Sequence, residues 1–285
     1  MQAQMVLIPA ESKKLICRAI FDLAEFQEAL EHGIVAIHPS SSTIFLYEMI
    51  TGHMPEGLWV CGVIAPKGLA GSSEAVEMIR SRGPGAHDPL KVSKETWFFV
   101  KGVLQQQAPL GEILGQMTET DVYVKGCNAM DTAGNAGVLF GNPAGGGGTI
   151  GKVVIAQRKR NFHMILPIGM EKLIPGSIQS ASKRAGFKKA DMATGLPCGL
   201  IPVPGRKIDE ADAMSLLFNV RATPIAAGGL HGAEGAVVLA CEGEEEQIQK
   251  AFAGIVKIKG ARLPVVNLPE CPESHYPTFS FKKER

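Results

Sequence analysis

The chain has 285 residues, of which 45% are hydrophobic and 20% charged, and this globular composition excludes a wholly disordered protein. Its 29 basic and 28 acidic side chains leave a formal net charge of +1, which excludes the basic excess typical of a dedicated nucleic-acid-binding protein. No uncharged apolar stretch approaches the ~18 residues of a membrane span. The 6 cysteines are scattered, and the 7 histidines lack metal-ligand spacing. We therefore expect a cytoplasmic protein without a metal, a cofactor, or a nucleic-acid or membrane partner.

Strands and helices alternate through the first two thirds of the chain. The spacing of apolar residues predicts a helix over residues 11–31, and the apolar run of residues 34–37 is typical of a buried parallel strand. Further strands are predicted near residues 58–65, 97–101, 121–125 and 162–166, and helices near residues 44–50, 111–117 and 150–159. This alternation predicts an α/β domain over residues 1–195, with a Rossmann-like open parallel sheet.

The pattern changes after residue 197. A strand at residues 198–203 and a helix capped by Asp209 precede a strand pair, a second helix at residues 244–253 and a strand at residues 255–258. The strand pair covers residues 223–227 and 236–240. This β-α-β-β-α-β order predicts a ferredoxin-like α+β domain over residues 196–262, followed by an irregular tail over residues 263–285. The sheet face of such a domain and the long tail indicate a homo-oligomer.

The first candidate binding segment is a hydroxyl-rich turn. Four hydroxyl residues separate the predicted strand of residues 34–37 from the next helix: Ser40, Ser41, Ser42 and Thr43. Backbone N–H groups and hydroxyls at a helix N-terminus bind phosphate or carboxylate well. One hydroxyl is enough to cap a helix, so four of them favour an anion site over a simple cap.

The second candidate segment follows the predicted strand of residues 121–125. Lys125, Asn128 and Asp131 lie where ligands bind in open α/β sheets, at the carboxyl end of a strand. A glycine run follows, and it precedes Lys152 near the start of a helix: Gly145, Gly146, Gly147 and Gly148. Consecutive glycines let backbone amides approach an anion closely. The alternative interpretation is a flexible glycine hinge with solvated charges.

Two further patterns are weaker. Gly146, Gly148 and Gly151 match the G-x-G-x-x-G dinucleotide motif, with Glu171 twenty residues further on, but about twenty residues separate the motif from its strand. The segment at residues 228–235 is expected to be a turn between two strands. Its His231 and Glu234 could alternatively reach a site across a subunit boundary.

The order of these segments resembles a known family. The stretches IVAIHPSSST, DVYVKGCNAMD and GGGGTIGKVVIA are similar to the A-type ribose-5-phosphate isomerases. These isomerases share a superfamily with DeoR-type sugar-sensing domains and CoA transferases. The resemblance covers most of residues 11–260. It implies that the serine and threonine turn holds a phosphate, and that the segment after residue 121 carries the chemistry.

The departures from that family concern its catalytic carboxylates. Lys125, Asn128 and Ala129 stand where the isomerases have two aspartates and a glutamate, and Gly151 stands at the position of the catalytic base. Aldose–ketose isomerisation needs such a base, so the sequence predicts that the isomerase activity is absent. No glutamate matches the nucleophile of the CoA transferases. The fold resemblance therefore does not carry the activity with it.

The sequence thus predicts a protein that binds a phosphorylated or carboxylated small molecule. If it is an enzyme, Asp131 and Lys125 are the candidate catalytic residues, although Asp131 could instead hold its loop in place. The alternatives are a non-catalytic small-molecule sensor and an enzyme that binds a CoA ester or a nucleotide.

Overall fold

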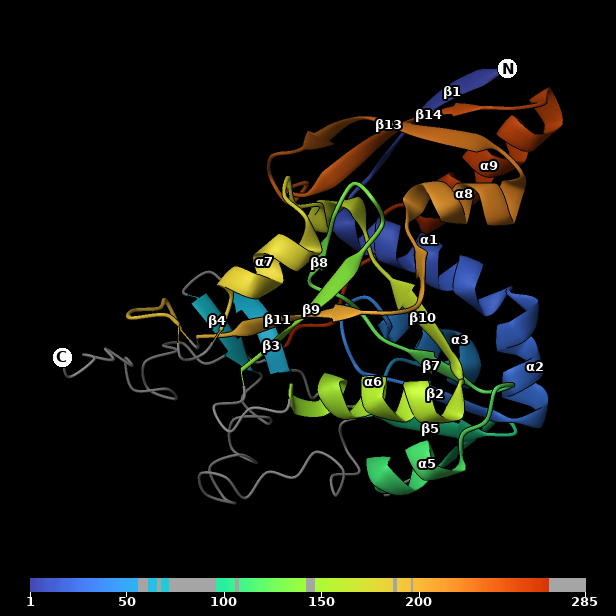
Figure 1. Cartoon of the computed structure of the whole chain (residues 1–285). Helices are drawn as coiled ribbons and strands as arrows, with labels where there is room; N and C mark the ends of the chain where they lie inside the picture. The colour runs from blue at the N-terminus through green and yellow to red at the C-terminus, as the bar shows by residue number, and fades with distance from the viewer. Residues whose placement is uncertain are drawn as a thin grey trace.

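A six-stranded sheet forms the centre of the computed structural model, which describes residues 1–55, 61–65, 68–71, 96–105, 108–141, 147–186, 189–195 and 197–266 (Figure 1). Its strands lie in the order β12-β10-β7-β2-β5-β6. Their bounds are β2 Ile34–Ile37, β5 Trp97–Val100, β6 Val103–Gln105, β7 Val122–Val124, β10 His163–Pro167 and β12 Arg206–Ile208. Strands β12, β10, β7 and β2 are parallel, whereas β5 and β6 are antiparallel. The fold is therefore mixed α/β.

The sheet is mixed rather than wholly parallel, which corrects the expected open parallel sheet. Strands β5 and β6 are joined by the tight turn Lys101–Gly102, whose φ angles of 49° and 75° are both positive. A two-residue turn of this kind can only join antiparallel neighbours. The expected strand at residues 97–101 is confirmed as β5, and the expected strand at residues 34–37 is confirmed as β2.

Helices cover both faces of this sheet (Figure 1). Alternate residues of β2 belong to different cores: Val35 and Ile37 pack with α1 (Pro9–Phe21), α2 (Ala24–His32) and α3 (Ile44–Thr51), and Ile34 and Ala36 pack on the other face. That second face is covered by α5 (Leu110–Gln116) and α6 (Gly148–Arg160). A fully apolar strand is required because both faces are buried.

The predicted single helix over residues 11–31 is wrong, because two helices occupy this stretch. Leu23 has an extended backbone with ψ 136°, and its carbonyl accepts hydrogen bonds from the N–H groups of Phe26 and Gln27. These bonds start α2 in a new direction. Asp22 ends α1 and binds the Nε of Arg18 at 2.9 Å. The apolar spacing continues across the break, so periodicity alone does not detect it.

A second, three-stranded sheet has the order β1-β14-β13, formed by β1 (Gln2–Leu7), β13 (Arg221–Gly228) and β14 (Ala236–Glu242). It is antiparallel throughout, and it packs on α8 (Glu210–Phe218) and α9 (Glu245–Ile258). The predicted strand pair and the Asp209 cap are confirmed. The carboxylate of Asp209 accepts the N–H of Asp212 at 3.0 Å.

The element order expected for residues 196–262 is corrected in two places. Residues 255–258 form the last turn of α9 and not a strand, because Ile248, Ala251 and Ile255 continue one buried helical stripe. The expected strand at residues 198–203 exists as β11 (Gly199–Val203), but it pairs with β9 (Ala136–Phe140) in a different sheet. The third strand of the small sheet comes instead from the N-terminus, as β1.

Smaller elements complete the described part of the chain. Strand β8 (Ala129–Met130) joins β9 and β11 in a sheet beside α7 (Ile178–Arg184). Strands β3 (Cys61–Ala65) and β4 (Gly68–Gly71) form a two-stranded sheet, and β3 is the C-terminal part of the expected strand at residues 58–65. The short helix η2 (Met170–Lys172) follows β10. Most of the predicted tail, from residue 267 onward, lies outside the described residues.

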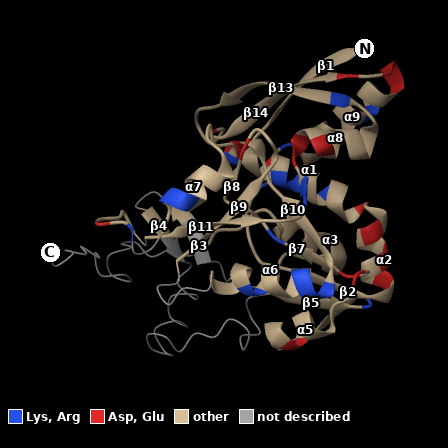
Figure 2. Ribbon diagram, viewed as in Figure 1, with Lys and Arg blue, Asp and Glu red and all other residues tan. Residues whose placement is uncertain are grey.

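Charged residues of both signs are spread over different elements. Acidic residues lie along α2, and basic residues lie on α6 (Figure 2). The basic residues Arg158, Lys159 and Arg160 occupy the last turn of α6, where positive charge complements the helix dipole. Among the described helices, none combines the length and the apolar character that crossing a bilayer would require.

Candidate functional site

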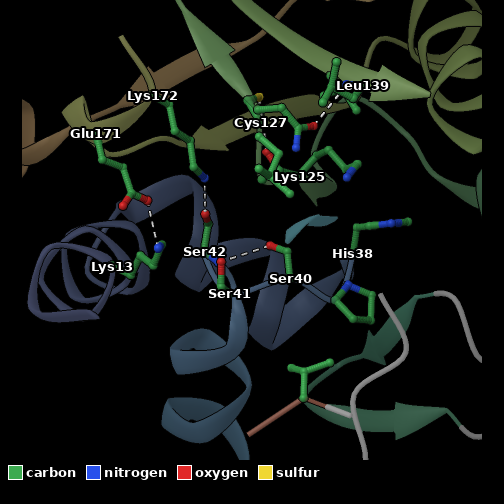
Figure 3. A pocket seen from close by; sticks show the side chains of 16 residues that line it. Lys13, His38, Ser40, Ser41, Ser42, Lys125, Cys127, Leu139, Glu171 and Lys172 are labelled. Carbon is green, nitrogen blue, oxygen red and sulfur yellow. Dashed lines mark hydrogen bonds and ion pairs between the residues drawn. The ribbon is translucent and has the colours of Figure 1, made fainter. Parts of the chain in front are cut away.

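A cavity of about 390 Å³ lies between the loops that follow β2 and β7 (Figure 3). A volume of this size suits a small molecule. The two loops are neighbours because β2 and β7 are parallel neighbours, and the backbone N–H of His38 donates to the carbonyl of Val124 at 3.0 Å. On the other side of β7, the backbone N–H of Lys125 donates to the carbonyl of Ile165 in β10 at 3.0 Å. The cavity therefore lies at the carboxyl ends of parallel strands, where α/β proteins bind ligands.

The serine turn forms one wall of the cavity. Ser40, Ser41 and Ser42 line it, whereas Thr43 is fully buried and is not among the lining residues. The hydroxyl of Thr43 donates to the carbonyl of His38 at 2.7 Å, and Ser40 Oγ accepts the N–H of Ser42 at 3.2 Å. Thr43 thus shapes the turn. The three serines are brought together as the sequence predicts.

Gly126 lets the second loop approach this turn. A Cβ atom added to Gly126 would lie 2.6 Å from Ser40 Oγ and 3.2 Å from Ser42 Cβ. A larger residue at this position would require the side chains of Ser40 and Ser42 to shift. Asn128 also lines the cavity, and its side-chain oxygen accepts the N–H of Leu139 at 3.0 Å. Lys125 and Asn128 therefore lie beside the serines, so the cavity joins residues of the two candidate segments.

Two lysines that the sequence analysis did not select complete the site. Lys172 Nζ, from η2, donates to Ser42 Oγ at 2.8 Å, and Lys13 Nζ, from α1, forms a 2.8 Å ion pair with Glu171 (Figure 3). Both lysines line the cavity. Lys172 follows β10, the next parallel strand beyond β7, so the strand-end argument that selected Lys125 could have selected it as well.

The cavity shifts the pKa values of three of its groups. Burial, and then the positive charge of Lys13, lowers the pKa of Lys172 to about 8. Burial raises the pKa of the Cys127 thiol to about 11, although Lys125 and Lys172 oppose this change. Burial and Lys125 hold the pKa of His38 well below its usual value. At neutral pH the thiol is therefore protonated, the imidazole is neutral, and part of the Lys172 amine is neutral.

Asp131 lies outside the lining residues of the cavity. Its carboxylate accepts hydrogen bonds from the backbone N–H groups of Ala133, Asn135 and Ile178 at 2.9–3.1 Å, and from the amide side chain of Asn135. The bond from Ile178, followed by those from Asn135, lowers the pKa of Asp131. Both oxygens are thus occupied in joining the β8–β9 loop to the first residue of α7. This arrangement favours the loop-holding alternative.

The described part of the glycine run is a helix start. Gly147 and Gly148 have φ angles of 73° and 60° and begin α6, and neither lines the cavity. A Cβ on Gly147 would lie 2.3 Å from Ile201 Cδ1, so close packing on β11 explains this glycine. Lys152 is exposed on α6 and is not among the lining residues. Gly145 and Gly146 lie outside the described residues.

The remaining sequence patterns have structural explanations. Glu171, which the dinucleotide interpretation assigns to a ribose, is paired with Lys13. Residues 228–235 connect β13 to β14, as expected for a turn. His231 and Glu234 are exposed there, and the Glu234 carboxylate accepts the N–H of Gly232 at 2.8 Å.

Comparisons with known proteins add no family to this description. No protein-family model, curated protein or solved structure matches the chain. Within the described ranges, no group of three or more His, Cys, Asp or Glu residues is arranged to hold a metal ion. The functional argument therefore depends on the geometry and charge of the cavity.

Proposed function

We propose that this protein binds a phosphorylated or carboxylated small molecule in the cavity between the loops after β2 and β7. The charge of the cavity carries this proposal. Three lysines, Lys13, Lys125 and Lys172, are among the described lining residues, against the single carboxylate of Glu171. That carboxylate already pairs with Lys13 at 2.8 Å. A lining with three lysines and one carboxylate favours an anionic ligand.

The local backbone supports the same proposal. The serine turn lies at the N-terminus of α3, where the helix dipole favours negative charge. Ser41, a lining residue, lies next to Ser42 in this turn. A phosphate or carboxylate could accept hydrogen bonds from such hydroxyls while its charge is balanced by Lys125 and Lys172. The predicted glycine nest is not needed for this arrangement.

The proposal includes a distant relationship to the A-type ribose-5-phosphate isomerases. Parallel strands with helices on both faces, and a serine turn after the strand that ends at Ile37, support a Rossmann-like first domain. The small sheet with α8 and α9 would then correspond to the ferredoxin-like domain, with β1 as an added strand. A homo-oligomer and a cytoplasmic location remain predictions.

Phosphate or sulfate is expected to raise the melting temperature more than chloride at the same ionic strength. The double variant Ser41→Ala with Ser42→Ala should lose most of this response, because it removes two of the hydroxyls that line the cavity. The matched control is Ser180→Ala with Ser215→Ala, two exposed serines on other helices. Equal stabilisation of all three proteins would contradict the anion site.

A second variant tests the same site without removing a polar group. Gly126→Ala introduces a methyl group 2.6 Å from Ser40 Oγ and 3.2 Å from Ser42 Cβ, so the serine side chains that line the cavity must shift. We expect a roughly tenfold weaker affinity for phosphate, which corresponds to about 1.4 kcal/mol of binding free energy. Gly115→Ala is the control, since a Cβ there meets no atom within 4 Å. Titration calorimetry with inorganic phosphate measures both.

The protein is expected not to interconvert ribose 5-phosphate and ribulose 5-phosphate at an enzymatic rate. That reaction needs a positioned base, worth roughly 10²–10⁴-fold in rate. Gly151 cannot act as a base, and the carboxylate of Asp131 is occupied by hydrogen bonds outside the cavity. A coupled assay at high protein concentration, with Asp131→Asn alongside, measures this. Turnover near 1–10³ s⁻¹ in the unmodified protein would show that another residue supplies the base.

A further inference from the structure

Lys172 is held firmly at the edge of the cavity. Its backbone belongs to η2, and the N–H of Met170 in the same turn donates to the buried carboxylate of Glu210 at 2.9 Å. Glu171, the next residue, is fixed by its ion pair with Lys13. The Lys172 side chain crosses from this turn toward Ser42 on the opposite wall (Figure 3). Contacts with α8 and α1 therefore hold the neighbouring residues of this turn, and Ser42 positions the amine itself.

The partner of this amine is a neutral hydroxyl. Other lysines of the protein meet carboxylates: Lys13 pairs with Glu171, and Lys259 pairs with Glu11 at 2.7 Å. In the part of the chain that the structure describes, no carboxylate oxygen forms an ion pair with Lys172 Nζ. A partly buried amine with a neutral acceptor and a second ammonium nearby loses its proton more easily than a solvated lysine. Neutral lysine amines in such cavities are nucleophiles.

We propose that Lys172 forms a covalent imine with the aldehyde or ketone group of an anionic small molecule. This inference rests on the proposed anion site, which it deepens by naming the substrate class. The neutral Nζ attacks the carbonyl carbon, so that a C–N bond forms and the carbonyl oxygen takes up a proton. The resulting carbinolamine then loses one molecule of water and leaves a C=N bond. The step needs no oxidant, reductant or metal.

Other groups of the cavity could assist the addition and bind the anionic part of the substrate. Ser42 Oγ lies 2.8 Å from Nζ and can pass a proton between the nitrogen and the oxygen during the addition. Lys125 lines the same cavity, and its positive charge attracts a phosphate or carboxylate of the substrate. The thiol of Cys127, which also lines the cavity, is buried and donates a hydrogen bond to the carbonyl of Lys125. Lys172 is therefore the better placed nucleophile.

Pyridoxal 5′-phosphate is a suitable probe because it carries both an aldehyde and a phosphate. The full chain is incubated with less than one equivalent of this probe, the imine is reduced with borohydride, and the modified residues are mapped by mass spectrometry. We expect labelling of Lys172 at least about tenfold above that of exposed lysines such as Lys250. Lys172→Arg should lose the label, and Lys250→Arg should keep it.

Two further arms separate this inference from the anion site. Excess inorganic phosphate should reduce the labelling of Lys172, and pyridoxal, which lacks the phosphate, should label it more weakly. If neither excess phosphate nor the use of pyridoxal lowers the labelling of Lys172, the result would support a nucleophilic Lys172 and contradict the anion site. A phosphate-dependent rise in melting temperature without preferred labelling of Lys172 would overturn the imine and leave the anion site standing. The labelled residues of the protein without substitutions distinguish these outcomes even if a variant does not fold.

Discussion

Replacing Asp131 with alanine is expected to lower the melting temperature by about 5 °C or more, because three backbone donors lose their acceptor together. The N–H groups of Ala133, Asn135 and Ile178 all donate to this carboxylate at 2.9–3.1 Å. Ile178 is the first residue of α7 and is fully buried. Its amide has little access to water once the carboxylate is gone, so the attachment of α7 to the β8–β9 loop should weaken.

The pH dependence of this effect has a definite sign. The folded protein holds the pKa of Asp131 below its ordinary value of 3.8, first through the N–H of Ile178 and then through Asn135. Above pH 3.8 the ionised carboxylate therefore stabilises the folded protein. This stabilisation is lost as the pH falls through the lower pKa that Asp131 has in the folded state. The difference in melting temperature between the original protein and Asp131→Ala should therefore become smaller at acidic pH, and thermal unfolding at several pH values measures it.

The controls distinguish a structural aspartate from a catalytic one. Asp191→Ala, at an exposed position, should leave the melting temperature nearly unchanged. Asp131→Asn keeps one acceptor oxygen and should cost less than Asp131→Ala. A catalytic aspartate would behave differently, since Asp131→Ala would then keep the melting temperature of the original protein. That result would return Asp131 to the list of candidate catalytic residues.

The central sheet could be predicted because its signals are local. The apolar run at residues 34–37 needs burial on both faces, and the structure provides it with α1 and α3 on one side and α5 and α6 on the other. Two loops that follow neighbouring parallel strands meet at one edge of the sheet. The serines and Lys125 could therefore be placed in one site from their positions after these strands.

Lys13 could not be selected in the same way, and the position of Lys172 after β10 does not reveal its lowered pKa. Lys13 lies in a helical stretch whose apolar spacing identifies its core residues and gives no role to a charge. It is buried, and its ammonium pairs with Glu171, which lies far along the chain in η2. The lowered pKa of Lys172 likewise depends on burial and on Lys13. Such contacts between distant segments leave no periodic pattern in the sequence.

In the small sheet, contacts between distant segments also decide secondary structure that local sequence does not predict. The branched residues at 255–258 have strand propensity, yet Ile255 shares a buried helical stripe with Ile248 and Ala251. Tertiary burial on α8 and the sheet decides in favour of the helix. The pairing of β1 with β14 joins two segments that lie far apart in the chain, with Gln2 opposite Glu242. The sequences of β1 and β14 contain no local pattern that predicts which strand each one pairs with.

Replacing Lys172 with methionine is expected to stabilise the protein at pH 7. Burial and Lys13 lower the pKa of this lysine from 10.5 to about 8, so its ammonium is less stable in the folded protein than in the unfolded chain. One pKa unit corresponds to about 1.4 kcal/mol, and the lost hydrogen bond to Ser42 offsets part of the gain. A net gain of about 2 kcal/mol, or several degrees in melting temperature, is the expected result.

The gain should disappear as the pH rises. Between pH 8 and 10.5 the unfolded chain binds a proton at Lys172 that the folded chain does not, so the stability of the original protein rises with pH relative to the methionine variant. The difference in melting temperature should therefore shrink from pH 7 to pH 9.5. Lys250→Met, at an exposed position paired with Glu246, is the control and should change little at either pH. A methionine variant that is less stable than the original at pH 7 would contradict the buried, destabilised amine, and with it the physical basis for a reactive Lys172. A stabilised variant would instead show that Lys172 lowers the folding stability of the protein. Residues that are retained for function often have such a cost in stability.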